Sequence, residues 1–223
     1  MDIKERLKRW FKLRFAVLYP FAVFMIIFAN CDDRSLRYGI WLIAAGELIR
    51  MWANGYAIKT EKLTTSGPYA FVRHPLYLGT LLLVAGFIVF LRAYYIGAAL
   101  LAVMAIVYSG TIKKEEALLG GKFKEYAAYK KRVPALFPAI FPYKEGEKWG
   151  FSLERFFRSQ EYKPVLWIGV IIIGFYLKGK FLVDKEPLDA GKIRLMAVAA
   201  LLITADITGE IVKWFKRRHK RGE

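Results

Sequence analysis

Residues 66–79 read SGPYAFVRHPLYLG, a polar stretch that interrupts a sequence that is apolar on both sides. It holds two prolines, two glycines, two tyrosines and the pair Arg73-His74. Unpaired polar groups are costly inside a membrane, so such a stretch needs a reason. One reading is a loop between two membrane helices, in which Gly67 opens a turn and Pro75 begins the next helix. The other is a binding site built at the membrane surface.

The composition indicates a membrane protein. The chain has 223 residues, of which 56% are hydrophobic, and its mean hydropathy is +0.28. The apolar residues gather in blocks close to the roughly 20 residues that a helix needs to cross a bilayer. Lys and Arg number 36 against 19 Asp and Glu, a net charge of +17. These basic residues flank the apolar blocks, which fits anionic lipid headgroups and the positive-inside rule better than nucleic acid.

The single cysteine, Cys31, excludes an intrachain disulfide and a multi-cysteine zinc site, and no metal site is implied.

The apolar blocks predict an all-α, polytopic membrane bundle that forms one domain over residues 1–223. Both ends of the chain are basic, so we expect both termini in the cytoplasm and an even number of spans. The loop after the fifth span, expected outside, nevertheless carries several lysines beside its acidic residues. The six expected spans cover residues 15–29, 36–58, 76–91, 94–112, 165–182 and 193–212, and interfacial helices are expected at 1–14 and 151–162.

Two expected spans carry charged or polar residues. Glu47, Arg50 and Asn54 have spacings of three and four, which place them on one helix face. That face is either a structural ion pair within the bundle or part of a polar cavity. Asp206 and Glu210 form either a second inward face or a helix end near the surface.

An even number of spans places residues 66–79 and 113–142 on the same, cytoplasmic side, where they can meet. Together they offer an imidazole, a guanidinium, tyrosine hydroxyls, two adjacent carboxylates and apolar walls. This inventory suits a zwitterionic, partly aromatic ligand. The sequence has no nucleophile elbow and no phosphate-binding glycine loop. The residues are Tyr69, Arg73, His74, Tyr77, Glu115, Glu116, Tyr126, Tyr129, Leu136, Phe137 and Pro138.

Two motifs, GPYAFVRHPLYLG at 67–79 and EEALLGGKFKEYAAYKKRVPALFP at 115–138, resemble the signature of a family of membrane methyltransferases. Isoprenylcysteine carboxyl methyltransferase and phosphatidylethanolamine or phospholipid methyltransferase typify this family. The resemblance implies a helical core over residues 36–142 that binds S-adenosylmethionine on the cytoplasmic side, while a lipophilic acceptor enters from the bilayer. Residues 151–223, an interfacial helix and two further spans, lie outside it. The expected cofactor-binding residues are Tyr69, His74, Tyr77, Glu115, Glu116, Tyr126, Tyr129, Pro134 and Leu136.

The sequence departs from the family just before the acidic pair. The prenylcysteine enzymes carry an arginine there that is tied to the acceptor carboxylate, whereas this chain has Lys113 and Lys114. Arginine and lysine are not interchangeable at a bidentate carboxylate site.

Methyl transfer from a sulfonium is an in-line displacement, in which orientation of the reactants can contribute about 7–11 kcal/mol. An amine acceptor would need a base, and a carboxylate acceptor would need a cation to hold it. The candidate bases are Glu116, Glu115 and His74, and the candidate cations are Lys113, Lys114 and Arg73. The predicted catalytic residues are Glu116, Arg73 and Lys114.

Two other functions remain open from the sequence. Membrane sterol-reductase proteins, which use NADPH, are similar in their cofactor region and also carry an Arg-His pair followed by a nearby tyrosine. The proline after His74 favours the methyltransferase. The third possibility is a non-catalytic membrane protein whose basic ends bind anionic lipid.

Overall fold

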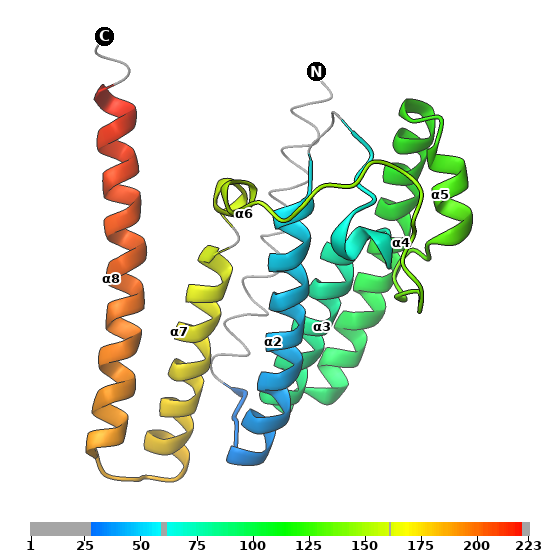
Figure 1. Ribbon diagram of the computed structural model, residues 1–223. Helices are drawn as coiled ribbons and strands as arrows, with labels where there is room; N and C mark the ends of the chain where they lie inside the picture. The colour runs from blue at the N-terminus through cyan, green and yellow to red at the C-terminus, as the bar shows by residue number, and fades with distance from the viewer. Residues whose placement is uncertain (1–27, 59–61, 161, 220–223) are drawn as a thin grey trace, which may run out of the picture.

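The computed structural model describes residues 28–58, 62–160 and 162–219, and this part of the chain is helical and contains no strand (Figure 1). The all-α prediction is therefore confirmed for these residues. The elements are α2 (Asp33–Tyr56), the 3₁₀ helix η1 (Gly67–Ala70), α3 (Pro75–Phe90), α4 (Tyr94–Lys122), α5 (Tyr126–Arg132), α6 (Leu153–Ser159), α7 (Tyr162–Lys178), the π-helical η2 (Gly179–Val183) and α8 (Ala190–His219).

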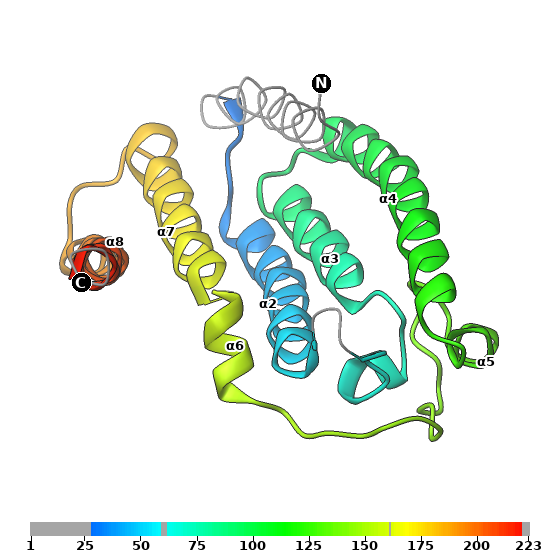
Figure 2. The same ribbon diagram turned by 90° about the horizontal axis from the view of Figure 1, so that it is seen from above.

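The long helices stand side by side. Seen from above, α2 and α3 lie at the centre, α4 flanks α3, and α7 followed by α8 lies on the side of α2 (Figure 2). His74, at the start of α3, and the C-terminal halves of α2 and α4 lie at one end of the bundle, which we call the site end. The turn between α3 and α4 and the loop between α7 and α8 lie at the opposite end (Figure 1).

Three helices among the described residues are long and apolar enough to cross a membrane, namely Tyr94–Lys122, Tyr162–Val183 and Ala190–Val212. They indicate an integral membrane protein. Helix α3 is apolar but has only 16 residues, and α2 has 24 residues but carries Glu47 and Arg50. The predicted interfacial helix at 1–14 and nearly all of the predicted first span at 15–29 lie outside the described residues. The number of six spans therefore stays a prediction.

Helix α2 begins at Asp33 because Asp32 and Ser35 cap it reciprocally. The Asp32 carboxylate accepts a hydrogen bond from the Ser35 backbone N–H at 2.7 Å, and the Ser35 hydroxyl accepts one from the Asp32 N–H at 2.9 Å. The Ser35 hydroxyl also lies 2.9 Å from the carbonyl oxygen of Phe90, to which it donates. The cap of α2 is thereby tied to the last turn of α3.

Helices α2 and α3 approach closely because glycines face each other. A Cβ atom on Gly46 would lie 2.6 Å from the carbonyl oxygen of Gly79, and one on Gly86 would lie 2.7 Å from Ile43. Small residues of this kind let two membrane helices bring their backbones together. The start of α3, which carries His74, is thus fixed against α2.

The polar face predicted on α2 is turned toward α3. Glu47 and Arg50 form an ion pair with 3.7 Å between Oε1 and Nε, and the Arg50 guanidinium donates to the hydroxyl of Thr80 at 2.6 Å. The Asn54 side-chain amide donates to the Arg50 carbonyl oxygen at 2.9 Å. This face is part of the contact between the two helices.

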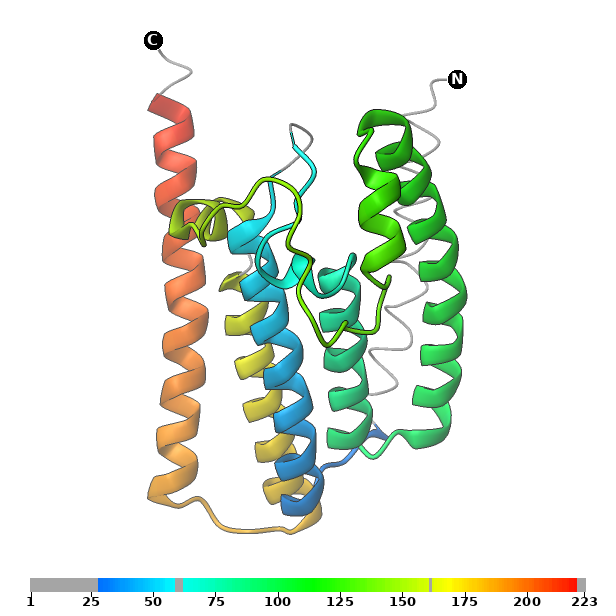
Figure 3. The same cartoon turned by 45° about the vertical axis from the view of Figure 1, so that its right-hand side comes forward.

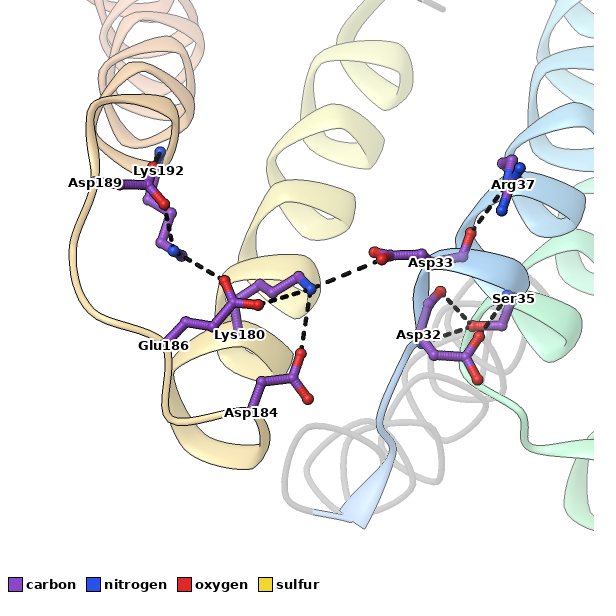
Figure 4. Close-up of polar contacts among 9 residues, drawn as sticks. All are labelled: Asp32, Asp33, Ser35, Arg37, Lys180, Asp184, Glu186, Asp189 and Lys192. Carbon is purple, nitrogen blue, oxygen red and sulfur yellow. Dashed lines mark hydrogen bonds and ion pairs between the residues drawn. The ribbon is translucent and has the colours of Figure 1, made fainter.

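Charged residues at the opposite end connect three helices (Figure 4). Lys180 lies 3.1 Å from a Glu186 oxygen, 3.2 Å from Asp184 and 3.8 Å from Asp33 at the start of α2. Lys192 lies 3.0 Å from the second oxygen of Glu186 and also pairs with Asp189. Two of the lysines that seemed out of place in an outer loop are therefore neutralised by carboxylates from that loop.

The acidic residues of α8 face α7. The Asp206 carboxylate accepts a hydrogen bond from the Trp167 indole at 3.1 Å and lies 3.6 Å from the Lys163 ammonium. Glu210 pairs with the same lysine. Asp206, with its side chain 14% exposed, therefore faces inward, whereas Glu210, at 49%, fits a helix end near the surface.

Candidate functional site

The sequence of residues 66–79 sets its own local structure. Gly67 has φ +61, a left-handed conformation that favours glycine, and a Cβ atom there would lie 2.6 Å from the Tyr56 ring. Pro68 follows in η1, and Pro75 occupies the first turn of α3, where its missing N–H costs nothing. His74 is the N-cap residue of α3. The turn and the helix start that the sequence predicts are thus confirmed.

The two predicted halves of the site are joined through their backbones. Residues 70–74 lie beside residues 134–143, which descend from α5 (Figure 3). Backbone hydrogen bonds of this kind fix the position and direction of the two segments. The side chains of one segment are therefore held in a fixed position relative to those of the other. The bonds run from Arg73 N to Pro134 O (2.9 Å), His74 N to Ala135 O (3.0 Å), Ala139 N to Phe71 O (2.8 Å) and Tyr143 N to Ala70 O (2.8 Å).

Glu116 is the centre of the side-chain cluster. Its Oε1 lies 2.9 Å from the Arg73 guanidinium and 3.4 Å from His74 Nε2, and its Oε2 lies 2.8 Å from the Lys130 ammonium. The glutamate side chain is 8% exposed. Arg73 also donates to the carbonyl oxygen of Lys130 at 3.3 Å. Helices α3, α4 and α5 are therefore tied together at one buried carboxylate.

Glu115 takes a different position from its neighbour. Its side chain is about half exposed, at 48%, and its Oε2 lies 3.6 Å from His74 Nδ1. Between the two glutamates, the imidazole is buried. This burial lowers the pKa of His74 below its ordinary value of 6.5, although both carboxylates oppose the shift. The imidazole is therefore neutral at physiological pH, and Glu115 presents carboxylate surface that a ligand can reach.

Tyrosines of α5 close the cluster. The Tyr129 hydroxyl donates to the Tyr69 carbonyl oxygen at 2.6 Å, which fastens α5 to η1. The Tyr126 hydroxyl is buried and makes no hydrogen bond within the described residues, and the same holds for Nε of Arg73. Burial raises the pKa of Tyr126 to about 12, so this hydroxyl stays protonated. Buried polar atoms without partners are rare, and a bound ligand is one way to satisfy them.

A second aromatic group extends from His74 to Tyr77 of α3 and Tyr108 of α4. The rings of His74 and Tyr77 have centroids 5.7 Å apart, and those of Tyr77 and Tyr108 are 4.7 Å apart. Tyr108 belongs to α4, so these contacts join the two helices below Glu116. They place aromatic surface between the polar cluster and the apolar part of the bundle.

Four of the predicted site residues lie at the margin of the cluster. Lys114 is exposed and precedes Glu116 by two residues, which on an α-helix turns it to nearly the opposite side. Pro134 takes part through its backbone oxygen, and Leu136 is half-buried next to it. Phe137, expected as an apolar wall, is 83% exposed. The backbone bonds at Pro134 and Ala135 hold this strand-like segment so that its following side chains turn outward.

Sequence reasoning missed Lys130, Tyr108 and Tyr143. Lys130 is one of three consecutive basic residues, and nothing in its flanking sequence separates it from Lys131. Tyr108 lies in an apolar block where a tyrosine is unremarkable by composition. Tyr143 is buried with its ring 5.2 Å from that of Tyr129. Each of these contacts joins residues that are far apart in the sequence, and it therefore depends on how the helices and the segment after α5 pack.

Within the part of the chain that the structure describes, no group of three or more His, Cys, Asp and Glu side chains could hold a metal ion.

Comparison with known proteins finds a similarity to one family over part of the chain. Residues 38–120 match the model of the isoprenylcysteine carboxyl methyltransferase family. The chain is 32% identical over 126 residues to the cobalt-zinc-cadmium resistance protein CzcN of Cupriavidus metallidurans, covering 56% of this chain and 58% of that protein. It is 31% identical over 107 residues to the nickel-cobalt-cadmium resistance protein NccN of Alcaligenes xylosoxydans xylosoxydans, covering 47% and 50%.

The chain thus spans about half the length of the curated relatives it matches. No solved structure matches it. The family match covers the Arg73-His74 motif and the Glu115-Glu116 pair, and so confirms the resemblance of this chain to the isoprenylcysteine carboxyl methyltransferase family.

Proposed function

We propose that this chain is an S-adenosylmethionine-dependent membrane methyltransferase that transfers a methyl group to a lipophilic acceptor. The observation that carries the proposal is the convergence of Arg73, His74 and Lys130 on Glu116, because it unites the two family motifs in one cluster. The family match supports methyl transfer as the reaction class. Exposed apolar helices on either side give a lipophilic acceptor a way to approach.

The residues of the cluster fit the cofactor chemically. S-adenosylmethionine supplies a methyl group on a sulfonium, together with an ammonium, a carboxylate, ribose hydroxyls and an adenine ring. The reachable Glu115 carboxylate suits the ammonium or a ribose hydroxyl. The buried Tyr126 hydroxyl and Arg73 Nε are donors without partners in the described structure, and they suit the cofactor carboxylate. The aromatic faces of Tyr77 and Tyr108 suit the adenine.

The surroundings of Glu115 and Glu116 differ, and they indicate different roles for the two residues. Glu116 is already engaged by two cations, so its role is to position Arg73 and the imidazole. His74 is neutral because of burial and can take up a proton that an acceptor releases. Lys114 points to the other side of α4, where it would meet only a polar group that approaches along that face. We infer that the site end faces the cytoplasm, where the cofactor is available.

A labelling experiment tests the proposal. Membranes that contain the protein are supplied with methyl-labelled S-adenosylmethionine, and the lipid-extractable products are identified. We expect label in a lipophilic product, and a loss of at least about tenfold for Glu115→Gln, the effect of losing a hydrogen bond to a charged group. Glu125→Gln, on an exposed glutamate at the start of α5, is the matched control and should keep full activity. Oxidation of NADPH without label transfer would replace this proposal with the reductase.

A further inference from the structure

Three bulky apolar side chains stand out from the segment between α5 and α6. Phe137 is 83% exposed, Ile140 is 88% exposed and Phe141 is 81% exposed. We call these three residues the apolar crest. Exposed side chains of this size on a membrane helix are ordinary because lipid covers them, but the crest lies on an irregular segment outside any helix. Clusters of this kind mark a contact with a protein or a membrane.

The place of the crest in the fold selects between these partners. After α5 the chain descends past η1 and then rises again to α6, and its lowest point lies below the level at which α7 begins (Figures 1 and 3). Helix α7 is one of the three candidate spans. The crest belongs to this segment, in which the Ala139 N–H donates to Phe71, just before the apolar helix α3. A bilayer that surrounds α3 and α7 therefore lies close to the crest.

The backbone of residues 137–143 is suited to a partly apolar environment. Irregular chain inside a membrane is limited by unpaired N–H groups. Pro138 and Pro142 have no N–H, Ala139 donates to Phe71 and Tyr143 donates to Ala70. Four of the seven residues from 137 to 143 therefore present no unpaired N–H group. This arrangement suits the boundary between headgroups and acyl chains, where water can reach the remaining groups.

The positive charges on both sides of the crest favour contact with an anionic lipid surface. Lys131 and Lys144 are exposed on the two flanks of the segment. Basic side chains beside inserted aromatic residues are typical of segments that lie in an anionic membrane interface.

We propose that the apolar crest inserts into the bilayer leaflet at the site end, with its basic flanks on anionic headgroups. The crest is carried by the same chain segment that is hydrogen-bonded to Arg73 and His74 through Pro134 and Ala135. Insertion would therefore hold the cofactor-side motif at a fixed depth relative to the lipid. This inference does not depend on the methyltransferase reaction. It depends only on whether the crest lies in lipid.

Site-directed fluorescence locates the crest. The only cysteine is removed by Cys31→Ser, and Phe141→Cys is then labelled with an environment-sensitive dye in the full-length protein, reconstituted in vesicles of phosphatidylcholine and phosphatidylglycerol. Ile106→Cys, 73% exposed on candidate span α4, is the lipid control, and Glu125→Cys is the water control. Accessible nitroxide-labelled lipids and aqueous iodide serve as competing quenchers.

The proposal expects blue-shifted emission at position 141 and quenching by the lipid nitroxides that is several-fold stronger than quenching by iodide. A nitroxide near the headgroup should quench this site more strongly than one near the chain end, and Ile106→Cys should show the reverse preference. Quenching by iodide alone would place the crest in water and overturn the proposal. Protection from both quenchers would place it against protein, such as a second copy, and would overturn it equally.

Discussion

Glu116 combines burial with two cationic partners, which makes it the residue whose removal should affect stability most. Replacing it with alanine leaves Arg73 buried without its carboxylate, and breaking a buried pair in this way costs about 3–5 kcal/mol. We expect Glu116→Ala to lower the free energy of unfolding by about that amount, measured by denaturant titration in detergent micelles.

Lys130→Met is the matched comparison, because the lysine side chain is 52% exposed and its pair with Glu116 is screened by solvent. An exposed ion pair contributes about 1 kcal/mol or less. Equal losses from the two variants would contradict the central position of Glu116.

The buried imidazole makes stability depend on pH. The folded protein has a lowered pKa at His74, so as the pH falls below 6.5 the unfolded chain takes up a proton there before the folded protein does. The unfolded state binds more protons in this range, and the contribution of His74 to stability is therefore present above pH 6.5 and decreases as the pH falls. Unfolding measured between neutral and mildly acidic pH should show a shallower decline for His74→Gln. A steeper decline in the variant would refute the assignment.

At the scale of helices, the contact between α2 and α3 positions the start of α3. Gly46→Ala would place a methyl group 2.6 Å from the Gly79 carbonyl oxygen, so the helices must separate. Overpacking of this kind typically costs about 1–3 kcal/mol. Gly174→Ala on α7 is the control, because no atom lies within 4 Å of the added Cβ, and alanine favours a helix. Thermal unfolding in detergent should separate the two variants, with the α7 variant at or above the unmodified protein.

The charged network at the opposite end should act only locally. Lys192→Met removes the ion pairs of Lys192 with Glu186 and Asp189, leaves Glu186 paired with Lys180 alone, and thereby loosens the connection between η2 and α8. We expect faster proteolysis between residues 184 and 189 and unchanged cofactor affinity, because the network lies at the far end of the bundle from His74 (Figures 1 and 4). A change in affinity with no change in proteolysis would show that this reasoning is wrong.

The sequence predicts elements better than it predicts their contacts. Pro75 at the start of α3 and the turn at Gly67 follow from local chemistry, and the structure confirms both. That residues 66–79 would meet the segment after Glu115 follows from topology and the family motifs. The role of Lys130 does not, because its ion pair with Glu116 depends on how α5 folds back on α4. The outward turn of Phe137 likewise depends on backbone bonds made by Pro134 and Ala135.

At the scale of the whole molecule, the bundle has a different kind of polar cluster at each of its two ends. The cluster around Glu116 at the site end leaves Glu115 half exposed and the buried Tyr126 hydroxyl without a hydrogen-bond partner among the described residues, whereas the lysines of the network at the opposite end are surrounded by carboxylates. Both ends are joined by α2, α3 and α4, so the site is held by helices rather than by loops alone (Figure 1). A rigid support of this kind favours catalysis that depends on orienting two bound reactants.

The most direct test of the account is isothermal titration of the purified protein in detergent with S-adenosylhomocysteine, the product form of the cofactor. We predict binding by the unmodified protein and by Glu125→Gln, and at least about tenfold weaker binding by Glu115→Gln with an unchanged unfolding temperature. Binding of NADPH with no binding of S-adenosylhomocysteine would contradict the account.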